Sequence, residues 1–211
     1  ITGAPGGGKS TLTDKLTRAL RRRGQTVGIV AVDPSSPFTG GALLGDRVRM
    51  SEHNTDPGVY IRSMATRGFL GGMARATGDV VKVLDASGKD VIIIETVGVG
   101  QDEIDVIGIA DTTCLILVPG LGDAIQSMKA GVMEIADIYV VNKADHPGAD
   151  QLCVEVSVRV EQDLHIKPTG WSPCVVRTVA VEDQGVDLLV EAIDRHRRYL
   201  DGHEVRLTIG Q

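Results

Sequence analysis

The stretch Gly3-Ala4-Pro5-Gly6-Gly7-Gly8-Lys9-Ser10, at the start of the chain, decides the fold class. It matches the phosphate-binding pattern G-x-x-x-x-G-K-[ST] and runs directly into an amphipathic segment, Ser10–Arg23. The glycines let successive backbone N–H groups converge on a phosphate, and the start of a helix favours negative charge. In such a loop the lysine reaches the β- and γ-phosphate oxygens and the serine hydroxyl holds Mg²⁺. The residues expected to bind the nucleotide here are Gly3, Pro5, Gly6, Gly7, Gly8, Lys9, Ser10 and Thr11.

The alternative for this stretch is a glycine-rich turn before a helix, and the rest of the chain argues against it. Apolar, β-branched runs alternate with helical patterns, as in a parallel sheet covered by helices. The expected strands are Val27–Val32, Val91–Ile94, Thr113–Val118, Ile138–Val141 and Val175–Val179. The expected helices are Ser10–Arg23, Gly72–Ser87, Ala124–Ala136 and Gly185–Tyr199. Leu152–Leu164 fits either period, and we assign a helix on topology.

These elements predict an α/β fold of the P-loop NTPase class, with a mostly parallel sheet covered by helices on both faces. No internal repeat or long linker divides the chain, so we expect residues 1–211 to form a single domain. The chain starts two residues before Gly3, which leaves little room for the strand that should precede the phosphate loop. We therefore expect the natural protein to extend upstream, where any targeting segment would be found.

Composition restricts the partners. The chain has 22 Lys and Arg against 28 Asp and Glu, a net charge of −6, which argues against nucleic acid or an anionic membrane as the main partner. No apolar stretch approaches the roughly 18 residues of a spanning helix. The three cysteines, Cys114, Cys153 and Cys174, are far apart, so we expect buried thiols in a reducing compartment and a cytoplasmic protein.

The tetrapeptide Asn142-Lys143-Ala144-Asp145 follows a predicted strand, where an open α/β sheet binds its ligands. The Asp145 carboxylate can accept hydrogen bonds from N1–H and the 2-amino group of guanine, whereas adenine offers neither donor. Asn142 can bond the N7 edge of the purine, and the stem of Lys143 can lie along the base. We therefore predict a guanine site; the alternative is a solvated turn.

The strand Val91–Ile94 ends at Glu95, with Gly98 three residues further on. A carboxylate here can hold the Mg²⁺ shell, and the Gly98 N–H can meet a γ-phosphate. Asp33 and Asp46 bracket a Ser- and Gly-rich loop that suits a segment closing on Mg²⁺; equally, Asp46 could cap a helix.

Catalysis by this second segment is expected to be weak. Val99 occupies the position of a water-orienting glutamine, with Gln101 as an offset substitute. We expect slow hydrolysis, at about 10⁻⁴ to 10⁻² s⁻¹.

Several phrases together resemble the MeaB/ArgK/MMAA family of GTPases, long labelled LAO/AO transport ATPases. They are Val32–Gly41 (VDPSSPFTGG), Leu44–Arg47 (LGDR), Arg62–Gly68 (RSMATRG), Glu95–Gln101 (ETVGVGQ) and Asn142–Asp145 (NKAD). Members of this family are G-protein chaperones of cobalamin-dependent methylmalonyl-CoA mutase. The resemblance runs from Gly3 to about Gly185, with the motifs in order.

The resemblance implies a Mg²⁺-dependent GTPase that gates cobalamin loading or protection of an acyl-CoA mutase. It implies Mg²⁺-binding and catalytic roles for Asp33 and Asp46 in a first switch and a second switch at Glu95–Gln101. Lys9 and Glu95 complete the expected catalytic set. A third switch, Val118–Lys129, would couple to the mutase through Lys129; otherwise Lys129 is a solvated helix lysine.

This chain departs from the family in two ways. Family members carry a helical N-terminal extension and a C-terminal dimerisation arm, and neither is recognisable in the chain, although the resemblance implies a homodimer for the full-length protein. The base-contacting loop, often Ser-Ala, reads Val179-Ala180, and the Ala180 N–H is expected to bond guanine O6.

Three other functions remain open from the residues. A nickel-insertion GTPase of the HypB or UreG kind needs His- or Cys-rich ligands, whereas the histidines here are scattered singly. An ATPase or kinase that energises lysine, arginine or ornithine transport would bind ATP, which Asp145 should reject. A nucleotide-binding module without turnover would release no phosphate.

Overall fold

The computed structural model describes residues 1–34, 53, 55–66, 72–96, 107–120, 130–164 and 170–203. Within these residues the strands form two parallel sheets, in the orders β3-β2-β4 and β1-β5-β6-β7. The strands are β1 (Thr2–Gly3), β2 (Val27–Pro34), β3 (Val59–Thr66), β4 (Val91–Thr96), β5 (Cys114–Leu117), β6 (Ile138–Asn142) and β7 (Cys174–Thr178). The predicted parallel sheet is confirmed.

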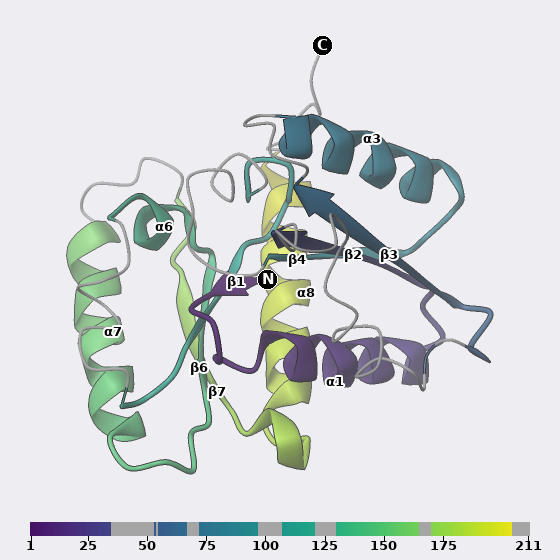
Figure 1. Cartoon of the computed structure of the whole chain (residues 1–211). Coiled ribbons are helices and arrows are strands. Elements are labelled where there is room, and N and C mark those ends of the chain that lie inside the picture. Colours follow the sequence, from purple (N-terminus) through teal and green to yellow (C-terminus); the bar gives the residue numbers. More distant parts are fainter. Residues whose placement is uncertain are drawn as a thin grey trace.

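Ile1 joins the two sheets. Its backbone nitrogen donates to the Ile94 carbonyl oxygen at 2.7 Å, and the Thr96 N–H donates to the Ile1 carbonyl oxygen at 3.1 Å. These bonds place β1 beside β4, so that the strands follow one another from β3 to β7 (Figure 1). The phosphate loop, which follows β1, therefore leaves the middle of the combined sheet.

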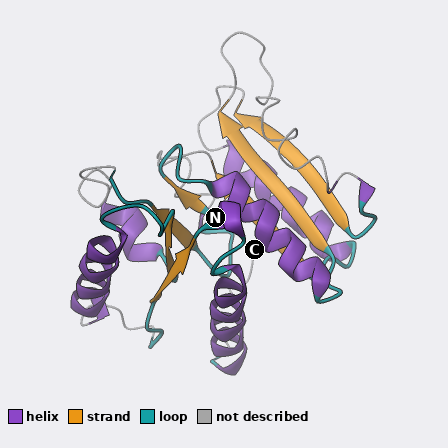
Figure 2. Ribbon diagram, turned by 90° about the horizontal axis from the view of Figure 1, so that it is seen from below, coloured by secondary structure: helices purple, strands orange, loops and turns teal. Residues whose placement is uncertain are grey.

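Helices cover both faces of the sheet, as the sequence predicts (Figure 1, Figure 2). The hydrophobic clusters place α1 and α8 on one face and α3, α6 and α7 on the other. The helices are α1 (Lys9–Arg22), α3 (Gly72–Ala86), α6 (Ala130–Ile135), α7 (Ala149–Leu164) and α8 (Val186–Gly202). The helical assignment of the ambiguous segment is confirmed by α7, while the predicted start of the helix at Ala124 lies outside the described residues.

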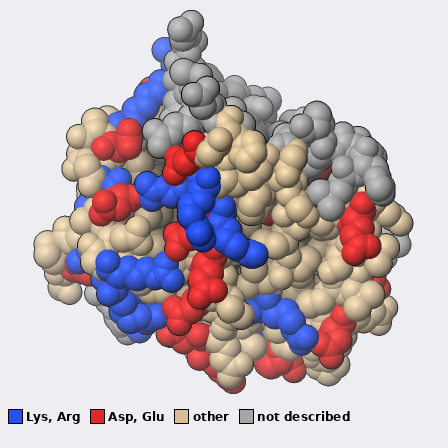
Figure 3. Space-filling view, turned by 180° about the vertical axis from the view of Figure 1, so that it is seen from behind, with Lys and Arg blue, Asp and Glu red and all other residues tan. Residues whose placement is uncertain are grey.

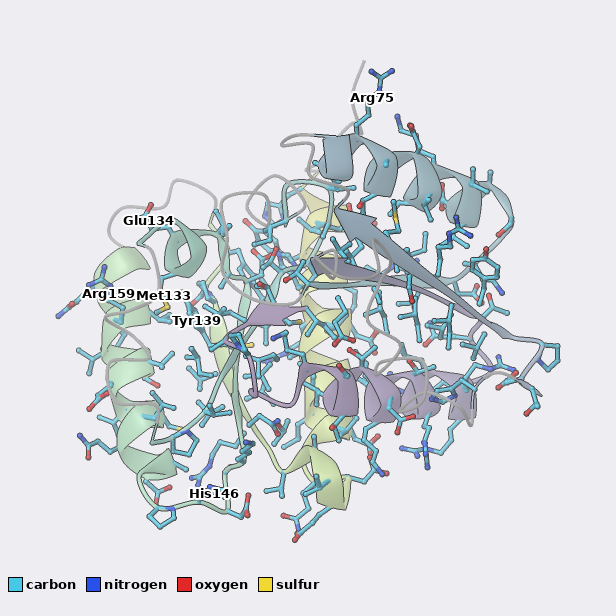
Figure 4. The ribbon with its side chains drawn as sticks, in the orientation of Figure 1. Arg75, Met133, Glu134, Tyr139, His146 and Arg159 are labelled. Atoms are coloured by element: carbon cyan, nitrogen blue, oxygen red, sulfur yellow. The ribbon has the colours of Figure 1, made fainter. Side chains whose placement is uncertain are left out.

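Alternation along the strands explains why both faces need helices. In β5, Ile116 packs with α1 and α8, whereas its neighbours Leu115 and Leu117 pack with α7. In β6, Val140 packs with α1 and α8 and Tyr139 packs with α7. The Tyr139 hydroxyl donates to the carbonyl oxygen of Met133 in α6 (Figure 4). Strands that are apolar on both faces cannot face water on either.

The sequence analysis missed β3. This strand alternates half-buried Val59 and Ile61 with exposed Tyr60 and Arg62, and it lies at the edge of the sheet. A strand that faces water on one side lacks the continuous apolar run of the interior strands. The turn signal Asp56-Pro57-Gly58 before Val59 could have marked its start.

Charges on the surface are mixed in sign. Figure 3 shows Lys and Arg side chains interleaved with Asp and Glu side chains over one face. Arg22 pairs with Asp183 at 3.6 Å and Arg23 pairs with Asp194 at 2.7 Å, which links the end of α1 to α8 and the turn before it. Within the described part of the chain, no helix is long and apolar enough to cross a bilayer.

Candidate nucleotide-binding site

A cavity of about 470 Å³ lies at the carboxyl ends of the central strands. This volume falls in the range of small-molecule sites, roughly 300–1,000 Å³. Four segments far apart in sequence meet there: the phosphate loop with the start of α1, the end of β4, the loop after β6 and the loop after β7. The lining residues are Pro5, Gly6, Gly8, Lys9, Ser10, Thr11, Glu95, Asn142, Lys143, Asp145, His146, Val179, Ala180 and Val181.

At two positions of the phosphate loop, Gly3 and Gly8, only glycine fits the space available. Gly8 caps α1 with φ 84°, and a Cβ built there would lie 2.5 Å from Asn142 Nδ2. A Cβ built at Gly3 would lie 2.4 Å from the Ile116 carbonyl oxygen, because β1 runs close to β5. A side chain at either position would push apart the elements that form the cavity.

Lys9 folds back over this loop. Its buried side chain donates from Nζ to the Gly3 and Ala4 carbonyl oxygens, at 2.8 and 3.0 Å. The ammonium group is thereby held inside the curve of the loop, next to the N-terminus of α1. This arrangement concentrates positive charge where the loop can accept an anion.

Ser10 and Glu95 meet at one wall of the cavity. The Ser10 hydroxyl donates to Glu95 Oε1 at 2.5 Å, and Glu95 is only 5% exposed at the end of β4. In the neighbouring strand β2, Ala31 is the register partner of Glu95, and Asp33 lies two residues after Ala31. The side chain of Asp33 is outside the described part of the chain. The hydroxyl and the carboxylate are oxygen donors of the kind that Mg²⁺ prefers.

The donor set has the size expected for Mg²⁺ with a nucleotide. Within the described ranges no group of three His, Cys, Asp or Glu side chains is arranged to hold a metal ion. Mg²⁺ in nucleotide sites is held by one or two protein oxygens, together with phosphates and water. Ser10 and Glu95 therefore fit Mg²⁺ bound jointly with phosphate.

Asn142 ties three segments together at the other end of the cavity. Its Nδ2 donates to the Gly7 carbonyl oxygen at 2.8 Å, while Oδ1 accepts from Thr178 Oγ1 at 3.0 Å and from the Ala180 N–H at 3.1 Å. The side chain is buried, with an exposed fraction of 2%. Only an amide of this length supplies both a donor and an acceptor here, so Asn142 fixes the phosphate loop against the end of β7.

These contacts bear on two predicted base contacts. The Ala180 N–H is already donated to Asn142, so a bond from this N–H to guanine O6 would compete with that interaction. Asn142 Nδ2 carries a second hydrogen that remains available for a purine N7. Both residues line the cavity where the sequence predicts the base, and both have a structural role that the sequence did not predict.

Lys143 and Asp145 follow Asn142 and reach the cavity from the same loop. Lys143 has φ 55°, in the left-handed region, and the Ala144 N–H donates to the Thr178 carbonyl oxygen at 3.0 Å. The Asp145 side chain is 47% exposed, and its Oδ2 lies 3.7 Å from His146 Nε2. The carboxylate is therefore accessible to a ligand.

Two lining residues were missed by the sequence analysis. His146 extends from the loop beyond β6, at the end of the molecule opposite α6 (Figure 4), and Val181 is a 73% exposed apolar side chain next to Ala180. Both directly follow residues that were predicted, which was the available signal. Four predicted residues, Asp46, Gly98, Gln101 and Lys129, lie outside the described residues.

The family model described as "Methylmalonyl Co-A mutase-associated GTPase MeaB" matches residues 1–207. The chain belongs to the MeaB family. A relative in Pyrococcus abyssi is 57% identical over 202 residues, which are 95% of this chain and 62% of the relative.

Two further MeaB-family relatives carry informative names. GTPase ArgK of Escherichia coli is 40% identical over 197 residues, 92% of this chain and 59% of that protein. The mouse protein named methylmalonic aciduria type A homolog, mitochondrial, is 38% identical over 191 residues, 88% of this chain and 45% of that protein. The chain thus spans about three fifths of the length of the first relatives, 62% in the archaeal case.

Solved structures agree on the fold of this MeaB-family chain. A LAO/AO transport system kinase superposes with a TM-score of 0.72 at 29% identity, over 96% of this chain and 59% of that one. HypB from Helicobacter pylori, solved with nickel, gives a TM-score of 0.62 at 15% identity, over 93% and 85% of the two chains. At that identity the second likeness shows the fold alone.

Proposed function

We propose that this chain binds GTP with Mg²⁺ and hydrolyses it to GDP and phosphate, and that this cycle controls cobalamin loading or protection of methylmalonyl-CoA mutase or a related acyl-CoA mutase. The observation that carries the proposal is the Asn142 bridge. It holds the phosphate loop and the Asp145 loop at two ends of one cavity, so that a single nucleotide can contact both.

Guanine selectivity is assigned to Asp145. Its carboxylate accepts from N1–H and the 2-amino group of guanine, while adenine would leave it facing an acceptor. An unsatisfied polar group costs about 1–3 kcal/mol, and more when it is charged. We therefore expect ATP to bind at least tenfold more weakly than GTP. The stem of Lys143 and the exposed side chain of Val181 offer apolar surface to the base.

The phosphates are assigned to the loop from Gly3 to Gly8 and to Lys9, whose ammonium already lies against the loop carbonyls. Ser10 and Glu95 would hold Mg²⁺, together with Asp33 and Asp46. Bound there, Mg²⁺ would neutralise charge on the β- and γ-phosphates. Glu95, buried at the end of β4, keeps the Ser10 hydroxyl oriented toward the cavity.

Turnover is expected to be slow. Lys9 can stabilise charge on the phosphate being transferred, but the side chain that the sequence offers for orienting the attacking water is Gln101, at an offset position. We therefore propose intrinsic hydrolysis in the range of about 10⁻⁴ to 10⁻² s⁻¹. A partner that supplies the missing group would accelerate it.

The mutase is proposed as the client on the strength of the MeaB family description and the name of the mouse relative. We assign Lys129 to coupling between nucleotide state and partner, and a homodimer to the full-length protein. A nickel-insertion role has only the fold of HypB in its favour. A transport-kinase role has in its favour only the name of one structural relative. That role would require ATP, whereas nickel insertion would require GTP.

Three measurements test the proposal. Titration with GDP, GTP and ATP should give at least tenfold tighter binding of guanine nucleotides, and equal binding of ATP would reject the assignment. Single-turnover hydrolysis of Mg²⁺·GTP should release phosphate; if none appears, the chain is a binding module. A pull-down with the full-length protein should then recover a cobalamin enzyme in a nucleotide-dependent way.

A further inference from the structure

His146 is a titratable side chain beside the residue that is assigned to the guanine base. Its Nε2 lies 3.7 Å from Asp145 Oδ2, and both residues line the nucleotide cavity. This distance is too long for a hydrogen bond, so a neutral imidazole leaves the carboxylate oxygen to a ligand. A protonated imidazole carries a positive charge and forms an ion pair with Asp145 at the same place.

The backbone holds His146 within the base-binding loop from both sides. The His146 N–H donates to the Lys143 carbonyl oxygen at 2.9 Å, which closes a four-residue turn from Lys143 to His146. The Ala149 N–H donates to the His146 carbonyl oxygen at 3.3 Å, where α7 begins. His146 and Asp145 therefore belong to one turn, and the imidazole remains within reach of the carboxylate.

A nucleotide base and a protonated His146 would act on the same carboxylate. Hydrogen bonds to an ionised acceptor are roughly twice as strong as neutral ones, so the bonds from guanine N1–H and the 2-amino group depend on the charge of Asp145. The same charge repels the N1 acceptor of adenine. An imidazolium beside Oδ2 offsets part of this charge, and it therefore weakens the bonds to guanine and reduces the penalty for adenine.

We infer that His146 is a specificity-determining residue whose protonation lowers the preference of the site for guanine over adenine, and this inference rests on the proposed function. An imidazole is the side chain that ordinarily changes charge between pH 5 and 8. Above this range Asp145 alone sets the preference, and the preference falls as pH falls. The Asp145 and His146 side chains are 47% and 54% exposed, so water screens the pair and the change should be about threefold.

Other charged groups of the described residues belong to the same loop, to the elements beside it and to the far end of the cavity. They are Lys143 of the loop, Glu182 of the turn after β7, Arg177 of β7 with its partner Asp150 of α7 at 2.6 Å, and Lys9 and Glu95 at the phosphate end. Any pH dependence that these groups cause persists in a variant that lacks only the imidazole. His146→Gln therefore isolates the contribution of His146.

The test measures the preference as the ratio of the ADP dissociation constant to the GDP dissociation constant, at pH 7.5, 6.5 and 5.5 with Mg²⁺ present. ADP and GDP carry the same diphosphate, so protonation of the phosphates cancels in the ratio. Both constants come from competition with a fluorescent guanine nucleotide. The full-length wild type is compared with His146→Gln, with His146→Lys and with the matched control His203→Gln, at an exposed histidine that does not line the cavity.

In the wild type and in His203→Gln the ratio should fall about threefold from pH 7.5 to pH 5.5. In His146→Gln it should stay constant. His146→Lys carries a positive charge at every one of these pH values, so its ratio should already lie below that of the wild type at pH 7.5. Because His146 is exposed, both substitutions should leave folding intact.

Three results would each overturn the inference: a wild-type ratio that does not change with pH, a wild-type fall that persists in His146→Gln, or a ratio in His146→Lys equal to that of the wild type at pH 7.5. Equal binding of ADP and GDP by the wild type at pH 7.5 would reject the proposed function as well. A guanine preference that is independent of pH would reject the inference and leave the proposed function in place.

Discussion

Asn142 Nδ2 donates to the Gly7 carbonyl oxygen at 2.8 Å, across 135 residues of sequence. This bond connects the phosphate loop to the loops after β6 and β7, because the same side chain also accepts from Thr178 and Ala180. The residue that was assigned to the base thus also determines where the phosphate loop lies. Any change at Asn142 should affect both ends of a bound nucleotide.

Replacement of Asn142 by alanine is expected to weaken binding of GDP more than tenfold. It leaves the Gly7 oxygen, the Thr178 hydroxyl and the Ala180 N–H without their partner, at about 1–3 kcal/mol for each buried group that finds no water. The free energy of unfolding should therefore fall by about 2 kcal/mol or more. Calorimetric titration with GDP and urea unfolding measure the two effects.

The variant Asn142→Asp separates the two sides of the bridge. It keeps an oxygen for Thr178 and Ala180 but replaces the donor to Gly7 by a buried carboxylate oxygen that faces the Gly7 carbonyl oxygen, so both affinity and stability should fall. Wild-type GDP affinity in both variants would mean that the bridge has no part in placing the phosphate loop.

Glu95→Gln is expected to remove most of the effect of Mg²⁺ on nucleotide affinity. The amide keeps an acceptor for the Ser10 hydroxyl but loses the negative charge, which a divalent cation needs more than a hydroxyl does. The dissociation constant for GTP is measured with Mg²⁺ and with EDTA. The ratio of the EDTA value to the Mg²⁺ value should be several-fold smaller in the variant than in the wild type. Affinity in EDTA should be unchanged.

A matched control for this substitution is Glu134→Gln, on α6 at the far end of β6 (Figure 4). Glu134 is exposed and does not line the cavity, so its variant should respond to Mg²⁺ like the wild type. If Glu95→Gln shows the full Mg²⁺ effect, Glu95 is not part of the metal site and the carboxylate merely orients Ser10.

Asp145→Asn is expected to exchange guanine for xanthine. Xanthine carries a carbonyl at C2 in place of the amino group, so the amide nitrogen of an asparagine can donate to it while the carboxylate would be repelled. GDP affinity should fall at least tenfold and xanthosine diphosphate affinity should rise, both measured by competition with a fluorescent nucleotide. The side chain is 47% exposed, so stability should change little.

The neighbouring His146 supplies the comparison, because its ring also reaches the cavity. His146→Ala should leave the preference between guanine and xanthine as in the wild type. A variant at Asp145 that still prefers GDP over xanthosine diphosphate would show that this loop does not recognise the C2 substituent.

The sequence was sufficient for the parts of the fold that repeat a simple pattern. The interior strands β5 and β6 are apolar on both faces, which only a covered parallel sheet explains, and the glycine run before Lys9 predicts the phosphate loop. The edge strand β3 was missed because Tyr60 and Arg62 face water and break the apolar run. Topology, rather than periodicity, decided α7 correctly.

The site was predictable in its residue types and less so in its contacts. Each end of the cavity carries its motif, but the pairing of Asn142 with Gly7 depends on how β6 and β1 are placed across β5, which no local pattern contains. The same holds for Ser10 and Glu95, 85 residues apart. Long-range contacts of this kind follow from the sheet order, which the sequence alone did not specify.

His196 is expected to make folding stability depend on pH. The side chain is 3% exposed, Nδ1 lies 2.8 Å from Thr112 Oγ1, and the ring packs 4.6 Å from that of Trp171. Burial lowers the pKa of His196 below its ordinary value, and Asp137 and Asp111 offset this only in part. In the unfolded chain the imidazole takes up a proton near pH 6.5, whereas in the folded protein it does so only at lower pH.

Below about pH 6.5 the unfolded state therefore holds more protons, and stability falls as pH falls toward the folded pKa, by at most about 1.4 kcal/mol per pH unit for one group. Urea unfolding at pH 7.5, 6.5 and 5.5 should show a smaller loss of stability in His196→Gln than in the wild type. His203→Gln, at an exposed position after α8, controls for the removal of a histidine. Equal pH dependence in His196→Gln and the wild type would mean that the buried imidazole is protonated as readily in the folded protein as in the unfolded chain.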